Sequence, residues 1–362
     1  MKKDELKEKE VQDAWALIHN ASRIALLTHM SPDGDALGSA LGMRHWLEAL
    51  NDGRRREVSV IVPNTYPGFL SWMPGAKEIA IYDTPEGKEQ ADIALAQADL
   101  FLCTDFNEPK RVGILSDRLS DRNGAGKPIL LIDHHLFPGD WADVTISYPD
   151  SPSASELVYR LIRRIEATEG TDPLPQKSAV CLYTGMMTDT GNFSFNSNRA
   201  DMYDIVGELV RSGVDKDAVY NAVYNAWSAD RMRLVGYCLY NKMRLFPEHH
   251  TALICLGRKD LYRFNFKSGD AEGIVNMPLQ IKDIYYSCFM REDKEVMQDD
   301  SKRTKIKLSF RSQGEERPVN TMAHELFNGG GHTNAAGGEY YGPLKEAEAL
   351  FVENYAKYFI ES

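Results

Sequence analysis

The fold of this chain is clearest in one stretch, Ile24-Ala25-Leu26-Leu27-Thr28-His29-Met30-Ser31-Pro32-Asp33-Gly34-Asp35. Its first four residues form the short apolar run that is typical of a buried strand. The residues from Asp35 to Leu50 have the pattern of a helix. Between strand and helix, Pro32 and Gly34 turn the chain, and this loop carries one histidine and two aspartates. The stretch therefore predicts an α/β unit with polar side chains at the carboxyl end of a strand.

Three further polar motifs follow apolar segments. Asp105 follows the run 100–103, Asp133-His134-His135 follows the run 129–132, and Asp189-Thr190-Gly191 follows an apolar helix. Because open α/β sheets bind ligands at the carboxyl ends of their strands, we expect these residues to converge in one crevice. Carboxylate oxygens mixed with imidazole suit Mn²⁺, Mg²⁺, Fe²⁺ or Zn²⁺, and the lack of a thiolate near the motifs argues against a structural zinc site.

The spacing predicts how two ions would share these ligands. The histidine and the first aspartate of the first loop can face one ion, while the second aspartate of that loop faces the other. An aspartate from a neighbouring strand would bridge both ions. We expect His135 to meet the substrate and Asp133 to orient His134. The predicted metal ligands are His29, Asp33, Asp35, Asp105, His134 and Asp189.

Each motif has a structural interpretation when taken alone. Asp33 lies in a Pro-Asp-Gly turn, where aspartate usually serves the turn, and Asp105 could cap a helix. The pair His249-His250 lies in a predicted turn beside a proline. What favours a site is the joint occurrence of four motifs in a chain with nine histidines. Three histidines on predicted helices are not expected to be ligands: His19, His45 and His324.

Together the motifs resemble the signature of the DHH phosphoesterase family, of its DHHA1 subfamily, and of the bacterial nanoRNase/pAp-phosphatase branch. The first motif extends as His29-x3-Asp33-x-Asp35-Ala36-x-Gly38-Ser39, and the fourth as Asp189-Thr190-Gly191-x-Phe193. A fifth motif is Gly329-Gly330-Gly331-His332-x-x-Ala335-Ala336-Gly337. The resemblance covers residues from about 20 to 345.

The resemblance implies a phosphoesterase with two divalent ions, most typically Mn²⁺, with Mg²⁺ or another divalent ion as an alternative. The implied substrates are short single-stranded oligonucleotides, cleaved to mononucleotides, and pAp, converted to AMP and phosphate. His135, Asp105 and Asp133 would then be catalytic residues. The implied fold is an N-terminal DHH domain with a mostly parallel sheet flanked by helices, a helical linker, and a smaller C-terminal α+β DHHA1 domain.

The C-terminal part carries candidate phosphate-binding residues. Gly330 and Gly331 would let backbone N–H groups approach an anion, and His332 would add a hydrogen bond. A triple glycine is otherwise a flexible loop or a helix C-cap after 323–327. Arg311, at the end of an alternating strand, resembles the family's substrate-contacting arginine, and a guanidinium suits phosphate. Lys305 and Lys307, on the same strand as Arg311, are interpreted as surface charges.

Composition shifts place the domains at 1–198, 199–240 and 241–362, with the middle segment as the helical linker. In the last domain, 251–256, 285–290 and 305–310 have the pattern of strands. The charged residues 291–305 predict a long, mobile hairpin loop.

Composition narrows the classes of function. The chain has 362 residues and a formal net charge of −11, which argues against binding to long duplex nucleic acid through a basic surface. Its five cysteines form no C-x-x-C pair and indicate reduced thiols. The first ten residues are charged, and no apolar run has the length of a membrane span, so we expect a cytoplasmic protein without a membrane partner. A homodimer stays open.

Other functions share part of this pattern. A single-strand exonuclease of RecJ type has the same metal motifs, but this chain is acidic and shows no clear additional domain of the OB type. An exopolyphosphatase or pyrophosphatase would share the first four motifs, and the glycine-rich fifth motif favours the DHHA1 class over the pyrophosphatase type of second domain. A non-catalytic nucleotide sensor is disfavoured because every expected ligand position is kept.

Overall fold

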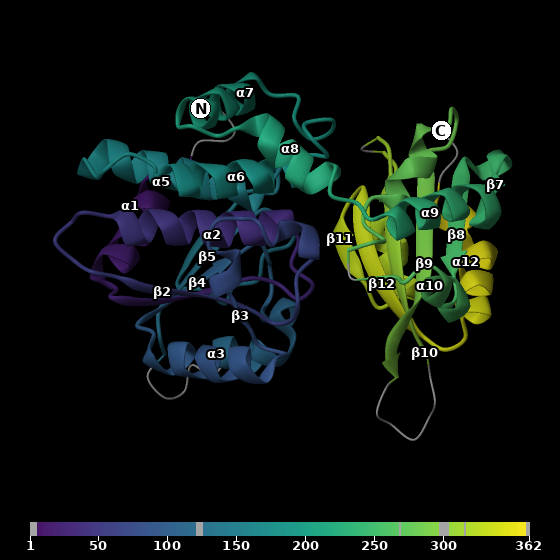
Figure 1. Ribbon diagram of the computed structural model, residues 1–362, viewed down its shortest axis with the longest axis horizontal. Coiled ribbons are helices and arrows are strands. Elements are labelled where there is room, and N and C mark those ends of the chain that lie inside the picture. Colours follow the sequence, from purple (N-terminus) through teal and green to yellow (C-terminus); the bar gives the residue numbers. More distant parts are fainter. Residues whose placement is uncertain (1–5, 121–125, 268, 297–303, 315, 360–362) are drawn as a thin grey trace. The chain divides into compact units, whose positions relative to one another are not determined.

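The computed structural model describes residues 6–120, 126–267, 269–296, 304–314 and 316–359, which divide into two compact units, Met1–Ala226 and Trp227–Ser362 (Figure 1). The domain limits at 198 and 240 stay a prediction. Of the helices between these limits, two belong to the first unit and one to the second. No helix in the described ranges combines the length and the apolar character that crossing a membrane requires.

The first unit is built on a parallel sheet of six strands in the order β3-β2-β1-β4-β5-β6. The strand order reverses between β1 and β4, and a crevice opens at the carboxyl ends of the strands at such a switch point. The predicted ligands His29 and Asp105 follow these two adjacent strands. The strands are β1 (Arg23–Leu27), β2 (Glu57–Val62), β3 (Ala80–Ile81), β4 (Leu100–Thr104), β5 (Ile129–Asp133) and β6 (Val144–Ser147).

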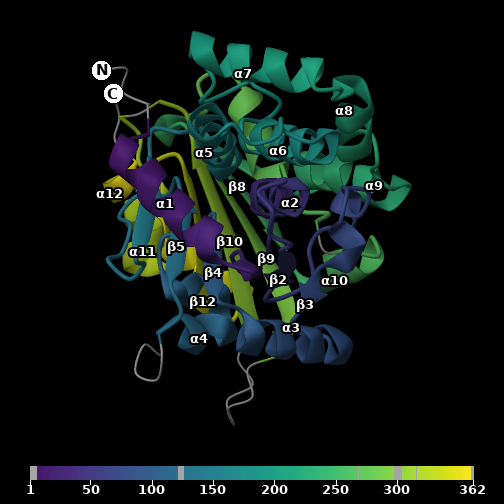
Figure 2. The ribbon, with the colours of Figure 1, turned by 90° about the vertical axis from the view of Figure 1, so that its left-hand side faces the viewer.

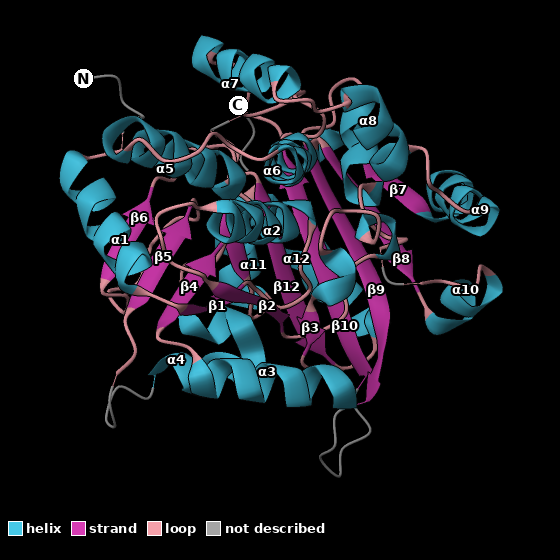
Figure 3. Cartoon of the chain, turned by 60° about the vertical axis from the view of Figure 1, so that its left-hand side comes forward, coloured by secondary structure: helices cyan, strands magenta, loops and turns pink. Residues whose placement is uncertain are grey.

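Helices cover both faces of this sheet, as Figures 1 and 3 show. Successive strand residues face opposite sides, so Leu26 joins the core beneath α1, α2, α5 and α6, while Leu27 joins the core beneath α3 and α4. Figure 2 shows α3 and α4 together on their side of the sheet. The helices are α1 (Glu8–Asn20), α2 (Gly34–Ala49), α3 (Pro85–Gln97), α4 (Ser116–Ser120), α5 (Ala154–Glu169), α6 (Gln176–Asp189), α7 (Ala200–Arg211) and α8 (Lys216–Tyr224).

Helices α2 and α6 cross closely because glycines line their contact. A Cβ added at Gly38 would lie 2.7 Å from the carbonyl oxygen of Cys181 and 2.8 Å from the Cα of Gly185. A Cβ added at Gly42 would lie 2.5 Å from the side chain of Leu182. The crossing matters for the site because α2 begins with the first aspartate loop and α6 ends at Asp189.

The second unit has a mixed sheet in the order β11-β12-β10-β9-β8-β7, in which only β8 and β9 pair in parallel. One face packs on α11 and α12, and the other packs on α9 and α10. Its elements are α9 (Ala229–Tyr237), β7 (Met243–Phe246), β8 (Thr251–Leu256), α10 (Arg258–Arg263), β9 (Tyr286–Val296), β10 (Thr304–Ser312), α11 (Asn320–Leu326), β11 (Gly330–His332), β12 (Ala335–Tyr341) and α12 (Leu344–Tyr358).

The predicted loop at 291–305 is wrong in its first part, because β9 continues to Val296. Charges are tolerated on this strand because they find partners. The Asp293 carboxylate lies 3.0 Å from Lys307 Nζ on β10, and the Arg291 guanidinium lies 5.2 Å from the centre of the Phe266 ring. Residues 297–303 lie outside the described residues.

Candidate metal centre and substrate-binding residues

The first cluster gathers His29, Asp33 and Asp105. The Nε2 atom of His29 lies 3.2 Å from Asp105 Oδ2 and 3.9 Å from Asp33 Oδ1. The other ring nitrogen of His29 lies 3.0 Å from the carbonyl oxygen of Met30, which leaves Nε2 facing the carboxylates. Ligand atoms of the three residues lie within 4.8 Å of one another.

Asp33 has a structural role in the turn in addition to its place in the first cluster. Its Oδ1 accepts hydrogen bonds from the backbone N–H groups of Asp35 and Ala36, each at 3.0 Å, and so caps helix α2. One loop therefore both starts the helix and presents a carboxylate to His29.

Asp105 lies between the two clusters. Its Oδ1 lies 3.3 Å from Nε2 of His134, on the opposite side of the carboxylate from His29. This oxygen is buried, yet it accepts no hydrogen bond from a described residue. The backbone of Asp105 is left-handed, with φ at 67°, and its N–H donates to the carbonyl oxygen of Ile132 on β5. A strained residue with a buried, unsatisfied oxygen indicates function, and Asp105 caps no described helix.

The second cluster gathers Asp35, His134 and Asp189. Nε2 of His134 lies 3.4 Å from Asp189 Oδ2 and 3.8 Å from Asp35 Oδ2. The Nδ1 atom of His134 lies 3.1 Å from the carbonyl oxygen of Ser151, which orients the ring. The six predicted metal ligands thus form two clusters that share the carboxylate of Asp105.

Two backbone N–H groups hold the Asp35 side chain, which is almost completely buried. Asp35 Oδ2 accepts from Ala154 at 2.6 Å, and Oδ1 accepts from Ser155 at 2.9 Å. Both donors belong to the first turn of α5, where Ser153 is the N-cap and its side chain accepts from the Glu156 N–H. Asp35 lies 119 residues away from Ala154, so sequence spacing could not reveal the contact.

Gly185 of α6 offers a sharp test of this packing. A Cβ at this position would lie 1.9 Å from Ser155 Oγ and 2.8 Å from Asp35 Oδ1. We expect Gly185→Ala to lower the free energy of unfolding by about 1–3 kcal/mol, since overpacked cores cost that much, and to weaken metal binding at Asp35. Denaturant unfolding and metal titration measure both effects.

The matched control is Gly236→Ala on α9, where an added Cβ meets no atom within 4 Å. This replacement should stabilise the chain slightly, because alanine is the better helix former. If Gly185→Ala behaved like this control, the close approach of α6 to Asp35 would be disproved.

Electrostatics in the two clusters are dominated by burial and by like charges. Burial and the neighbouring Asp105 and Asp189 carboxylates raise the pKa of Asp35 well above its ordinary value. Burial alone would raise the pKa of Asp105, but His134 and His29 hold it well below its ordinary value. Carboxylates that repel one another beside imidazole nitrogens form a donor set whose negative charge a divalent cation would neutralise, so these residues fit the two-ion site.

Asp133 does not orient His134, which corrects the prediction. Its Oδ1 lies 2.7 Å from Nδ1 of His135, and its Oδ2 accepts from the His135 backbone N–H at 3.1 Å. The reason is local: β5 ends at Asp133, and the chain then turns so that the residue two positions on folds back onto the carboxylate. His135 is therefore the imidazole that Asp133 holds in place.

Arg111 was not among the site residues predicted from the sequence. It lies on a short 3₁₀ segment, Pro109–Leu115, that follows β4, and its carbonyl oxygen accepts from the Met30 N–H at 2.8 Å. Burial and the positive charge of Arg111 both lower the pKa of His29. The carboxylates of Asp105 and Asp33 outweigh them, so the pKa of His29 is raised overall. A basic residue six positions after Asp105 was the available clue.

In the second unit, Arg311 and His332 flank one small residue. Arg311 of β10 is paired with Ala335 of β12, and His332 of β11 is paired with the same Ala335 from the other side. Directly opposed residues of antiparallel strands share a face, so the two cationic or polar side chains stand on one face with a methyl group between them. The two strand-surface lysines are ion-paired, as expected for surface charges: Lys305 with Glu339 and Lys307 with Asp293.

The three consecutive glycines end helix α11 and begin strand β11. Gly329 donates its N–H to the Ala323 carbonyl oxygen and ends α11, so the C-cap interpretation holds for this residue. A Cβ at Gly331 would lie 2.4 Å from the Ala335 carbonyl oxygen, whereas one at Gly330 would meet open space. Gly330 and Gly331 form strand β11, so they do not belong to a flexible loop.

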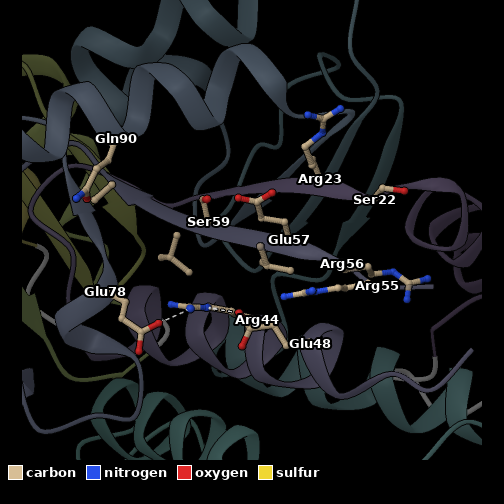
Figure 4. A pocket seen from close by; sticks show the side chains of 13 residues that line it. Ser22, Arg23, Arg44, Glu48, Arg55, Arg56, Glu57, Ser59, Glu78 and Gln90 are labelled. Atoms are coloured by element: carbon tan, nitrogen blue, oxygen red, sulfur yellow. Dashed lines mark hydrogen bonds and ion pairs between the residues drawn. The ribbon is translucent and has the colours of Figure 1, made fainter. Parts of the chain in front are cut away.

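A depression of about 900 Å³ lies elsewhere in the first unit, along β2 and α2 (Figure 4). Its arginines include Arg44, which pairs with Glu48 at 2.8 Å and with Glu78. It reaches Arg23 at the amino end of β1, whereas the predicted metal ligands follow the carboxyl ends of the strands. This depression is separate from the candidate metal centre.

Comparison with known proteins finds relatives over most of the chain. A model described as the DHH family N-terminal domain matches residues 23–186. Two similar proteins are both named bifunctional oligoribonuclease and PAP phosphatase NrnA. The Bacillus subtilis protein is 26% identical, with 88% of this chain and 89% of its own length covered, and the Thermus thermophilus protein is 27% identical, with 87% and 83% covered.

A solved structure is also similar over nearly the whole chain. It is an exopolyphosphatase-related protein from Bacteroides fragilis, with 43% sequence identity, a TM-score of 0.85 and 97% of each chain covered. Both units therefore have counterparts in one solved protein.

Proposed function

The chain belongs to the DHH family, and from this premise we propose that it is a metal-dependent phosphoesterase that hydrolyses short oligonucleotides to mononucleotides and converts pAp to AMP and phosphate. The observation that carries the proposal is the Asp105 carboxylate, which lies 3.2 Å from one candidate ligand histidine and 3.3 Å from the other. The named activities of the two NrnA relatives support the choice of substrates.

The proposed ligands of the first ion are His29, Asp33 and Asp105, and those of the second are Asp35, Asp105, His134 and Asp189. Mn²⁺ is the proposed ion because mixed carboxylate and imidazole donors suit it. When bound, two such ions would activate a water as nucleophile and neutralise charge on the phosphoryl oxygens.

The residues of the chain supply the rest of the reaction. Hydrolysis breaks the bond from phosphorus to the leaving oxygen, and that oxygen must gain a proton. We assign this task to His135, because Asp133 engages its Nδ1 and so fixes the orientation of its ring. Arg111 is exposed, no acid among the described residues pairs with it, and its charge reaches His29, so we assign it to a phosphate oxygen.

In the second unit, Arg311 is proposed to bind a substrate phosphate, with His332 beside it. We expect Arg311→Ala to lower kcat/KM for a 5′-phosphorylated dinucleotide by about 10- to 100-fold, mainly through KM, because a hydrogen bond to a charged group contributes roughly 1.5–3 kcal/mol. Steady-state kinetics would measure this loss.

The matched control is Lys307→Ala, at a position on the same face of β10 that is already ion-paired. Kinetics for this variant should stay close to those of the unmodified chain. Equal losses in the two variants would show that Arg311 acts through the strand and not through the substrate.

The proposed function is tested by turnover of four substrates with Mn²⁺: a 5′-phosphorylated RNA dinucleotide, pAp, a long single strand and pyrophosphate. We expect the first two to be hydrolysed far faster than the others. Preference for pyrophosphate would favour a phosphatase of inorganic chains, in line with the name of the exopolyphosphatase-related protein from Bacteroides fragilis. Preference for the long strand would favour a processive exonuclease.

A further inference from the structure

Phe137 is a solvent-exposed aromatic residue in the loop that carries the candidate catalytic histidine. Its side chain is 79% exposed, although it comes two residues after His135. Its backbone is left-handed, with φ at 59°, a conformation that a bulky residue adopts only under constraint. The chain thus accepts both an exposed ring and a strained backbone at this position, and such a combination indicates a functional role.

Hydrogen bonds from Asn107 hold this loop in place. The Asn107 side-chain amide donates to the carbonyl oxygen of Leu136 at 2.7 Å, and the Asn107 carbonyl oxygen accepts from Gly139 and from the indole of Trp141. Phe137 is therefore presented by an anchored loop. Preorganisation of this kind lowers the entropic cost of binding a ligand.

Other segments that follow strands of this sheet also expose an apolar side chain. Met30 follows His29 and is 48% exposed, and Ile114, in the segment after β4, is 72% exposed. Met30 packs toward that same segment, because a Cβ at Gly113 would lie 3.1 Å from its sulfur. Because these loops follow adjacent parallel strands, the carboxyl edge of the sheet combines a strongly acidic centre with apolar surroundings.

A chain of phosphates has no surface on which an apolar side chain can pack, whereas a nucleotide carries a flat aromatic base close to its phosphate. We propose that Phe137 stacks on a nucleobase of the substrate, so that the metal centre selects nucleotides over inorganic phosphate chains. This inference rests on the proposed function and deepens it. Stacking tolerates any base, because every base has a π face.

The test compares two substrates in the Phe137→Ala variant with Mn²⁺ present: a 5′-phosphorylated dinucleotide and the same compound lacking both of its bases. With the intact dinucleotide, kcat/KM should fall about 5- to 150-fold, the ratio that corresponds to roughly 1–3 kcal/mol of stacking. With the abasic compound, the variant and the unmodified chain should agree. Phe137→Tyr should restore the loss, since tyrosine keeps the aromatic face.

Tyr203→Ala is the matched control, because Tyr203 is a half-exposed aromatic residue on α7, away from the candidate ligands. Equal losses of kcat/KM on both substrates would mean that Phe137 only shapes the loop. No loss on either substrate would mean that the exposed ring contacts something other than the substrate, such as a protein partner. Both outcomes overturn the proposal. Failure of the unmodified chain to cleave either compound would instead count against the proposed function.

Discussion

Asp105→Asn should abolish most of the activity, lowering kcat/KM by about a thousandfold or more. The reason is the position of this carboxylate between His29 and His134, which no other described carboxylate shares at such short distances from both rings. Asparagine keeps the shape but removes the charge, and a bound ion contributes several kcal/mol to stabilising a phosphoryl transition state. Steady-state kinetics on the dinucleotide would show the loss.

The control for Asp105→Asn is Asp172→Asn, which makes the same change at an exposed acid outside the candidate site. That variant should keep full activity. A loss of less than tenfold in Asp105→Asn would contradict the role of Asp105 as the shared ligand, provided that both variants unfold at similar denaturant concentrations.

The neighbouring histidines should separate metal binding from catalysis. His135→Gln is expected to lower kcat by about 100- to 10,000-fold, the range that general acid–base groups contribute, with both ions still bound. His134→Gln should instead lose the second ion, because its Nε2 faces three carboxylates. Parallel kinetics and metal titration of the two variants make the comparison.

Asp133→Asn refines this prediction. The Asp133 carboxylate engages His135 and not His134, so the variant should resemble a mild form of His135→Gln, with a roughly 10- to 100-fold loss of activity and unchanged metal content. Metal loss in Asp133→Asn would show that Asp133 acts as a ligand or through His134.

The convergence of the candidate metal ligands could be predicted from the sequence because each motif lies at the end of an apolar segment. Parallel strands bring their carboxyl ends to one edge, so His29, Asp105 and His134 had to approach one another once β1, β4 and β5 were adjacent. The N-cap at Asp33 and the turn at His249 also follow from local chemistry.

Other contacts depend on geometry that residue order does not contain. The partner of Asp133 is decided by the sharp turn after β5, and the donors to Asp35 come from a helix more than a hundred residues away. The extension of β9 brings Asp293 against Lys307 of β10, a cross-strand contact that the run of charges did not reveal. The sequence does not show whether Phe137 is exposed or packed in the core, because an aromatic residue after a histidine motif is compatible with both.

The most direct measurement is the number of Mn²⁺ ions bound per chain, obtained by titration calorimetry and by metal analysis after dialysis. Two ions are predicted for the unmodified chain, one for His29→Ala, one for Asp189→Ala, and weak or no binding for Asp105→Asn. A single ion in the unmodified chain, or two ions retained in Asp105→Asn, would contradict a centre in which two clusters share one carboxylate.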